Sequence, residues 1–596
     1  MNTFFDYQNT QVANLPLHLR KYIVPQDYEK YTPIDHAVWR YVMRQNYSYL
    51  KNVAYYPYIP GLKKAGLTIE KIPSLQEIND ALTLIEWGAV TVDGFIPPAA
   101  FMEFQAYRVL VIAADIRQLE HIEYTSAPDI IHESAGHAPI ISDTDYNQYL
   151  SYLGFIGTKA IFSSKDFELY ETIRQLSILK EMPGIDEDVI KKTEATIFEQ
   201  QQNLGEPSEM ALLSRLQWWT VEYGLIGPLD QPKIYGAGLL SSIGESASCM
   251  RPEVKKIPYT IDALTYSYDI TKPQPQLFVT PTFQNLIDVL KQFESTMAFR
   301  VGGLSSVKKA IECKNICTLA YSSGIQVSGV CTQVLEGPGS SVAYIKTTGP
   351  TALAASHKQL HGHGKNYHAD GFGSPVGNLM GATKPLEDFT DQDLTDAGIE
   401  LNQEVLLSFE SGITVQGILR DITKQGTKNL IFSFTSCTVK SKEGLVLFDP
   451  SWGVFDMAVG TSIVSVFNGP ADISTFEDQL YVSPEQTHQP SYSGNDYAYH
   501  ALFAKVREIR GQIELEPITT AQLAELENIF NQVQASHKKD WLCALEILEI
   551  IAATEEDGPF SKTIRTYLER QKTEHPSFTT LITDGLGIID AKLIFQ

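Results

Sequence analysis

The chain has 596 residues, more than one ordinary domain holds, so we expect two to four domains. Hydrophobic residues make up 43% of it and charged residues 20%, a balance typical of globular proteins with large cores. The formal net charge of −24 repels phosphate backbones, which argues against nucleic acid as a partner and favours small molecules and cations.

The sequence shows no targeting or membrane segment. The N-terminus has no basic region followed by an apolar run, so we expect no signal peptide. The apolar run at 109–114 is far too short to cross a bilayer. Six cysteines are scattered without a common zinc-binding spacing, which is typical of reduced thiols, and we expect a cytoplasmic protein.

Residues 1–305 are predicted to be mainly helical. Apolar residues recur every three or four positions in three stretches, 37–53, 74–88 and 209–226. Ser74 and Glu77 form a capping box, which predicts a helix start there.

Residues 306–495 are predicted to be β-rich with an internal repeat. "YSSGIQVSGV" (321–330) matches "FESGITVQGI" (409–418), 88 positions further along the chain. The strand-like stretches 342–348 and 430–436 keep the same offset. In both copies a Ser-Gly pair separates two strand-like runs, as a tight hairpin requires.

We therefore expect two related β units, at about 319–350 and 407–440, paired into a small barrel or sandwich. The segment between them, 357–377, holds four histidines and many glycines. Two interpretations stay open for it: a flexible surface connector, or a segment that binds a metal or covers a site.

Residues 496–596 are predicted to form a helical C-terminal region. An apolar stripe runs along one predicted helix through Leu523, Leu526, Phe530 and Val533. We expect these helices to pack against the rest of the chain or to form a homodimer.

The stretch "PDIIHESAGHAPI" (128–140) contains two histidines five residues apart, His132 and His137. In an α-helix, which turns about 100° per residue, histidines four apart share a metal, whereas histidines five apart diverge by about 140°. Gly136 and Pro139 are able to end or distort the helix and return the second histidine to the first. The pattern therefore favours a metal held at the end of a helix.

Two neutral imidazoles need a carboxylate to compensate a divalent ion. Glu133 adjoins His132 and points about 100° away from it. Glu222 is a lone acid in the apolar stretch 217–226, where burial without a cation is costly. Two histidines and a carboxylate form the facial triad of non-haem Fe(II) oxygenases. The alternative to a metal site is a structural role, in which the two histidines are capped core residues and Glu222 is paired with an arginine.

Four segments resemble one enzyme family. They are "YIPGLKKAGLTIEKIPSLQEIN" (58–79), the histidine motif at 128–140, "WWTVEYGL" (218–225) and "YGAGLLSSIGE" (235–245). Together they are similar to the aromatic amino acid hydroxylases, which are pterin-dependent phenylalanine, tyrosine and tryptophan monooxygenases. The resemblance covers roughly residues 30–300.

The resemblance implies roles for individual residues. It makes His132, His137 and Glu222 the iron ligands. It places Arg117 at the substrate's carboxylate, Thr125 and Ser241 at neighbouring substrate contacts, and Pro128, Trp218 and Tyr223 around the aromatic ring. It assigns Gly94, Phe95, Ile96, Phe101 and Glu133 to the pterin, and Asp129 to orienting a ligand histidine.

The predicted function is a monooxygenase that uses Fe(II), a tetrahydropterin and O2 to hydroxylate an aromatic amino acid. L-Phenylalanine is the first expected substrate, because Trp218 fills space that an indole would need. A tryptophan or tyrosine ring hydroxylase is the alternative within the family. A zinc hydrolase, which needs the two histidines and a glutamate that activates water, is an alternative outside the family. A binding protein on an inactive oxygenase scaffold is another.

Overall fold

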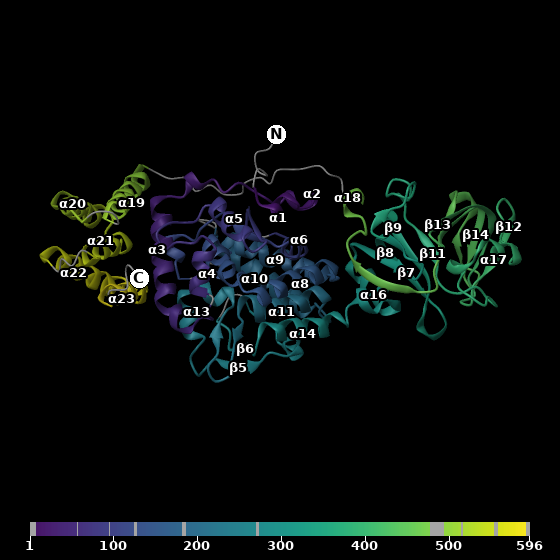
Figure 1. Ribbon diagram of the computed structural model, residues 1–596, viewed down its shortest axis with the longest axis horizontal. Coiled ribbons are helices and arrows are strands. Elements are labelled where there is room, and N and C mark those ends of the chain that lie inside the picture. Colours follow the sequence, from purple (N-terminus) through teal and green to yellow (C-terminus); the bar gives the residue numbers. More distant parts are fainter. Residues whose placement is uncertain are drawn as a thin grey trace.

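The computed structural model describes residues 8–56, 58–94, 96–123, 128–181, 186–269, 273–476, 494–513, 517–553 and 558–591. The molecule is elongated, with the N-terminal body at its centre (Figure 1). The β-rich region lies at one end of this body and the C-terminal helices lie at the other, although they follow each other in sequence. No described helix combines the length and apolar character that crossing a membrane requires.

The N-terminal body is mainly helical, as predicted. Its longer helices are α3 (Pro33–Val53), α5 (Leu75–Thr83), α6 (Pro98–Ala106), α8 (Thr144–Lys159), α9 (Ser164–Glu181), α10 (Glu187–Gln202), α11 (Glu209–Gln217) and α14 (Phe283–Glu294). The capping box at the start of α5 is confirmed, because Ser74 and Glu77 bond each other's backbone N–H groups. β1 (Gly88–Val92) pairs in parallel with β2 (Val109–Ala113), and a second small sheet has the order β4-β3-β6-β5.

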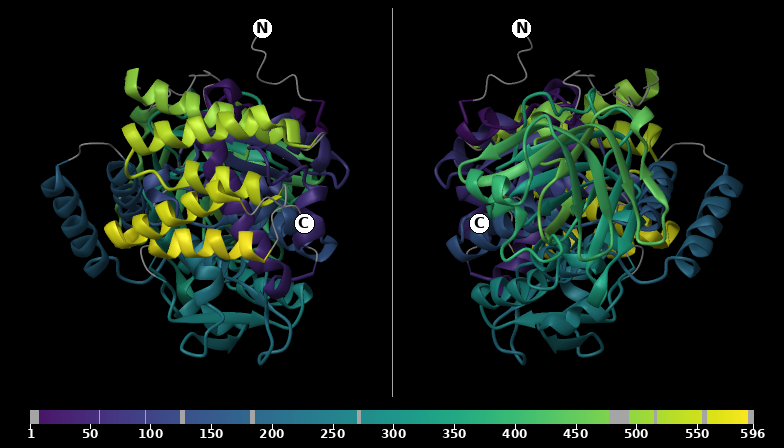
Figure 2. Two further views of the ribbon diagram at one scale, coloured as in Figure 1. Left: turned by 90° about the vertical axis from the view of Figure 1, so that its left-hand side faces the viewer. Right: turned by 90° about the vertical axis from the view of Figure 1, so that its right-hand side faces the viewer.

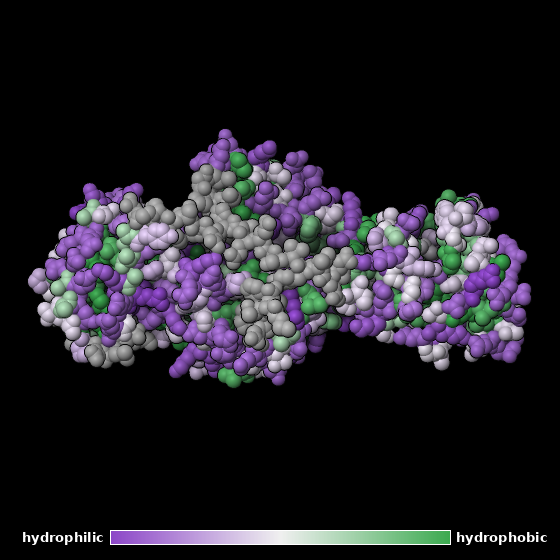
Figure 3. Space-filling model, turned by 90° about the horizontal axis from the view of Figure 1, so that it is seen from above, coloured by the Kyte–Doolittle hydropathy of each residue, from purple (hydrophilic) through white to green (hydrophobic). Residues whose placement is uncertain are grey.

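Two neighbouring helices, α9 and α10, project from the side of this body (Figure 2). Both carry apolar side chains exposed to solvent, among them Phe167 on α9 and Phe198 on α10. Elsewhere on the face seen in Figure 3, outside the grey atoms, hydrophilic residues predominate and hydrophobic ones are scattered. That distribution agrees with the high net charge.

The C-terminal region consists of α19 (Gly494–Ile513), α20 (Thr520–Ser536), α21 (Leu542–Ala553), α22 (Pro559–Glu574) and α23 (Thr579–Asp590). The predicted stripe on α20 faces inward, with Leu526, Phe530 and Val533 buried. Helix α21 is buried along nearly its whole length, and its neighbour Trp541 meets Tyr41 of α3 edge to face at 5.0 Å. The region therefore packs against its own N-terminal body, and a homodimer formed through it stays a prediction.

The β-rich region contains two antiparallel meanders. The first is β7 (Ile316–Tyr321), β8 (Ile325–Glu336) and β9 (Val342–Ala355); the second is β12 (Glu404–Ser408), β13 (Thr414–Gln425) and β14 (Lys428–Lys440). Each first hairpin turns at a glycine with positive φ, Gly324 at 96° and Gly412 at 84°. The hairpins expected at the Ser-Gly pairs are thus present, while descent of the two meanders from one repeat stays a prediction.

The two β units interlock through their cores. Leu430 and Ile431 of β14 pack into the core of the first unit, and Tyr344 of β9 packs into the core of the second. The junction is extended by β11 (Gly373–Pro375), which pairs with β9, and by β16 (Phe455–Ala458), which pairs with β14.

Candidate metal centre

Two short π-helices carry the predicted metal ligands. The first, η4 (Ile131–His137), contains both histidines, and the second, η5 (Trp218–Glu222), ends at Glu222. Hydrogen bonds in a π-helix span five residues, so residues five apart lie roughly above one another. The five-residue spacing of His132 and His137 is therefore the spacing that fits this backbone. The sequence predicts a distortion at the second histidine; in the structure the altered winding runs from Ile131 to His137 and is followed by the α-helix α7 (Ala138–Ile141).

Close packing explains why residue 136 is a glycine. A Cβ atom at Gly136 would lie 2.7 Å from the carbonyl oxygen of Ala237, at the start of α12 (Ala237–Ser241). Helix α12 therefore approaches the backbone of η4 directly, and a larger residue would push the two apart.

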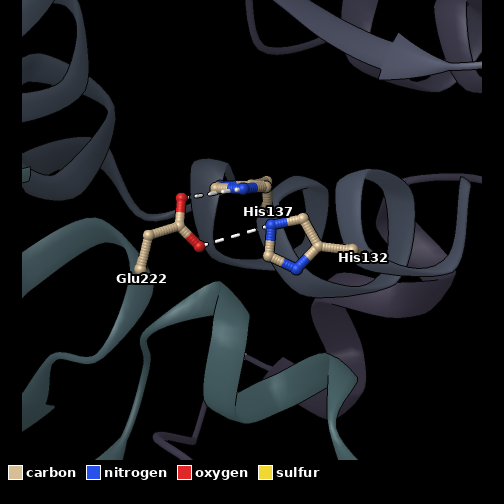
Figure 4. Close-up of side chains that lie close together, drawn as sticks. All are labelled: His132, His137 and Glu222. Carbon is tan, nitrogen blue, oxygen red and sulfur yellow. Dashed lines mark ion pairs between the residues drawn. The ribbon is translucent and has the colours of Figure 1, made fainter. Parts of the chain in front are cut away.

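The structure brings His132, His137 and Glu222 together (Figure 4). His132 Nε2 lies 3.3 Å from Glu222 Oε2, and His137 Nε2 lies 3.5 Å from Glu222 Oε1. The two imidazole planes are nearly perpendicular, with ring centroids 5.1 Å apart. Ligand atoms bound about 2.1 Å from one ion and next to each other are separated by about 3 Å, so this spacing suits a shared ion.

Ser241 determines which nitrogen of His132 is available. Its hydroxyl donates to the carbonyl oxygen of Ala237 at 2.8 Å, so its oxygen accepts from His132 Nδ1 at 2.9 Å. The Nδ1 atom then carries the proton, and the Nε2 lone pair faces Glu222. Ser241 therefore contacts the ligand histidine in the structure, and its predicted contact with the substrate stays a prediction.

Burial and neighbouring charges shift the pKa values of the two carboxyl groups in this cluster, Glu222 and Glu133. Burial alone would raise the pKa of Glu222, but the charges of His137 and His132 lower it below its usual value. Burial, reinforced by the charge of Glu222, raises the pKa of Glu133 to about 8. Glu133 Oε2 is buried and has no hydrogen-bond partner among the described residues. A carboxyl in this state is suited to a hydrogen bond with a bound molecule.

Arg117 is held in place by Asp129. The guanidinium donates to both carboxylate oxygens, from Nε to Oδ2 at 2.7 Å and from Nη2 to Oδ1 at 2.9 Å. Asp129 Oδ1 also accepts from the backbone N–H of His132 at 3.0 Å. Asp129 thus connects Arg117 to the histidine motif through the backbone of His132, and its predicted role in orienting a ligand histidine stays a prediction.

Three aromatic rings form a stack next to Glu222. Trp218 lies between Tyr223, at 4.7 Å, and Tyr268, at 4.5 Å, with both neighbours stacked on its faces. Since both faces of the indole are covered, Trp218 has only its edge free for a ligand ring. Tyr268 was not identified from the sequence, and it lies in a stretch without a motif.

Among the residues predicted to bind a pterin, Glu133 lies in η4 between the two histidines, and three others lie around β1 and β2. Gly94 has a positive φ of 64° in the turn after β1, and Ile96 and Phe101 pack into a small core over β1 and β2. The hydroxyl of Tyr170 on α9 donates to the backbone carbonyl of Ile96 at 2.6 Å and anchors the turn. Pro128 is half-buried directly before Asp129. Phe95 and Thr125 lie outside the described residues.

The donor set fits a divalent iron ion. Two neutral imidazoles and one carboxylate on neighbouring π-helices leave several coordination positions free, as in the facial triad of non-haem iron oxygenases. Both His132 and Glu222 are partly exposed, so small molecules have access to the ion's free side.

Comparisons with known proteins agree with this chemistry. The sequence model of the biopterin-dependent aromatic amino acid hydroxylase family matches residues 7–173 and 200–303. The gap between these ranges covers most of α10, and the match ends before the β-rich region.

Individual relatives cover the same share of the chain. Phenylalanine-4-hydroxylase of Mesorhizobium japonicum is 27% identical over 285 residues, which is 47% of this chain and 87% of that protein. The enzyme of the same name from Pseudomonas aeruginosa is 26% identical over 44% of this chain and 84% of its own length. A crystal structure of Chromobacterium violaceum phenylalanine hydroxylase with iron(III) and 7,8-dihydrobiopterin is 24% identical, covers 46% of this chain and 86% of that one, and has a TM-score of 0.37.

Proposed function

Since the chain belongs, through residues 7–173 and 200–303, to the biopterin-dependent aromatic amino acid hydroxylases, we propose that it hydroxylates L-phenylalanine to L-tyrosine with Fe(II), a tetrahydropterin and O2. The observation that carries this proposal is the cluster of His132, His137 and Glu222 on two adjoining π-helices. The relatives named phenylalanine-4-hydroxylase support the choice of phenylalanine.

The chain's own residues would hold and orient the reactants. When bound, Fe(II) and the reduced pterin supply the electrons that split O2, one oxygen atom going to the ring and the other to the pterin. His132 Nε2, His137 Nε2 and one oxygen of Glu222 would hold the ion, with Ser241 fixing the tautomer of His132. Glu133, whose buried Oε2 has no hydrogen-bond partner among the described residues, would form a hydrogen bond with the pterin.

The substrate would be oriented from both of its ends. Arg117 is fixed by Asp129 through Nε and Nη2, and its Nη1 donates to the carbonyl oxygen of Ile122 at 3.5 Å. The second Nη1 hydrogen would donate to the substrate's carboxylate. The edge of Trp218, held by Tyr223 and Tyr268, would limit the pocket to a single ring. Orientation of this kind places the ring beside the ion and raises the rate without new covalent chemistry.

The proposal is tested by product analysis. The full chain, loaded with Fe(II), is incubated with tetrahydrobiopterin, O2 and either phenylalanine, tyrosine or tryptophan, and products are separated and identified by mass. We expect tyrosine from phenylalanine at a rate at least about tenfold above the other two substrates. If pterin is oxidised while all three amino acids are recovered unchanged, the substrate is another molecule. Tightly bound zinc without iron-dependent turnover would favour a hydrolase instead.

Replacing Ser241 should weaken the metal centre without unfolding it. In Ser241→Ala the Nδ1–H of His132 loses its acceptor, so the ring is free to change tautomer and rotate. We expect Fe(II) affinity to fall by about 10- to 100-fold, measured by equilibrium dialysis and metal analysis. Ser246→Ala is the matched control, because Ser246 is also buried and its hydroxyl bonds, among the described residues, only to the backbone carbonyl of Ile243. Equal affinity in the two variants would contradict the role given to Ser241.

The cysteines agree with a cytoplasmic location. All six are buried and unpaired in the structure. Free thiols of this kind are typical of reducing compartments, and we include the cytoplasm in the proposal on that basis.

A further inference from the structure

The histidine-rich segment between the two β units brings part of itself against a distant aspartate. His363 and His368 belong to this segment, and Asp456 belongs to β16 of the second unit. His363 Nδ1 lies 3.2 Å from His368 Nε2 and 4.0 Å from Asp456 Oδ2. One ligand atom from each residue lies within 4.8 Å of the other two.

The backbone holds both histidines in place. The carbonyl oxygen of His363 accepts from Leu353 N at 2.9 Å, and that of His368 accepts from Thr351 N at 3.0 Å. Both donors belong to β9, so the segment is attached at two points to the first β unit. A site built on a strand in this way loses little conformational entropy when it binds an ion.

Asp456 is held just as firmly from the other unit. Its backbone pairs with Ser433 of β14, and the Ser433 hydroxyl donates to Asp456 Oδ1 at 2.5 Å. The remaining oxygen, Oδ2, is the one that faces His363. A hydrogen bond that fixes the second oxygen of a carboxylate is typical of metal-ligating carboxylates.

The charge balance favours a cation at this place. Asp456 is only 6% exposed, and in the part of the chain that the structure describes, its one ion-pair partner within 4.0 Å is His363. A buried carboxylate is costly unless a positive charge compensates it. Two neutral imidazoles supply lone pairs but no charge, whereas a divalent ion supplies the charge and uses the lone pairs.

We propose that His363, His368 and Asp456 bind a divalent transition-metal ion, with Zn²⁺ the best fit, and that this ion fastens the two β units together. Zinc bound at about 2.0–2.1 Å in a tetrahedron places neighbouring ligand atoms about 3.3 Å apart. The two imidazole nitrogens, 3.2 Å apart, already have that separation. Asp456 Oδ2, at 4.0 Å from His363 Nδ1, needs to approach that nitrogen by about 0.7 Å. The fourth position is left to water.

The alternative is a hydrogen-bonded cluster without an ion. The 3.2 Å separation also suits an N–H···N bond between two neutral imidazoles. With one imidazole protonated, the same arrangement would also compensate the charge of Asp456. It predicts neither zinc affinity nor a dependence of stability on metal, so metal binding distinguishes the two.

The proposal is tested in the full chain with the first centre disabled. In a Glu222→Gln background, chelator-treated protein is titrated with Zn²⁺ by calorimetry, and the melting of the β-rich region is followed with and without the ion. We expect one equivalent of Zn²⁺ to bind tightly and to raise the melting temperature. Adding His363→Ala or Asp456→Asn should weaken binding by at least about 100-fold and remove the rise.

The matched control is His361→Ala in the same background. His361 lies in the same segment but is exposed, so its loss should leave zinc binding unchanged. Asp456→Asn keeps the size of the side chain and an oxygen to accept from Ser433, so it separates ligand loss from misfolding. Zinc affinity that is absent in the background, or that His363→Ala and Asp456→Asn leave unaltered, overturns the proposal.

Discussion

Glu222→Gln is expected to abolish ring hydroxylation, lowering tyrosine formation by more than about 1,000-fold. The amide keeps the size of the carboxyl but loses the negative charge, so two imidazoles alone face the divalent ion. In the described structure Glu222 is the carboxylate paired with both histidines, whereas Glu133 is paired with His137 alone, at 3.6 Å, so we expect Glu133 not to replace it. Product formation and iron content, measured on the same samples, should fall together.

The control for this variant is Glu199→Gln on α10, which removes one exposed carboxylate far from any ligand motif. It should keep both activity and iron. Turnover that survives in Glu222→Gln would show that the ion is held elsewhere or that the reaction needs no ion at this place.

The sequence was sufficient to identify the three candidate ligands, because each is an unusual residue in its context. His132 and His137 share a short motif, and Glu222 is the one acid in an apolar stretch. The backbone that joins them was not predictable from spacing. A π-helix is less stable than an α-helix unless packing supports it, and here the support includes the contact of Gly136 with Ala237, a residue 101 positions later.

The features that escaped prediction all depend on contacts between distant segments. Tyr268 completes the stack on Trp218 from a loop with no motif, and Asp456 reaches His363 from another strand. Hydrophobic periodicity shows which face of a helix is buried but not what covers it. The C-terminal helices illustrate this, since their burial was predicted and their partner, α3, was not.

The attachment of these helices to α3 depends on a buried network of ions. Arg40 of α3 donates to both oxygens of Glu546 on α21, at 2.5 and 2.9 Å, and Arg44 pairs with Glu549. Arg510 of α19 bonds to Glu549 at 2.9 Å. All five side chains are nearly inaccessible to solvent, so their charges depend on one another for compensation.

We therefore expect Glu546→Ala to weaken the docking of the C-terminal helices by about 3–5 kcal/mol, because Arg40 is left buried without its bidentate partner. Backbone amides of α21 should exchange with solvent roughly 100- to 5,000-fold faster, as about 1.4 kcal/mol corresponds to each factor of ten. Hydrogen exchange followed by mass spectrometry measures this directly, and it does not require the whole chain to unfold in one step.

Two further variants separate the loss of charge pairing from the loss of packing. Glu569→Ala removes an exposed member of a surface pair with Lys572 and should change exchange in α21 very little. The double variant Arg40→Met with Glu546→Leu removes both charges and fills the space with apolar atoms, so it should restore much of the protection lost in Glu546→Ala. If the backbone amides of α21 exchange in Glu546→Ala as slowly as in the unaltered chain, apolar contacts such as that of Tyr41 with Trp541 are sufficient for docking. The ion pairs would then determine only how the helices align.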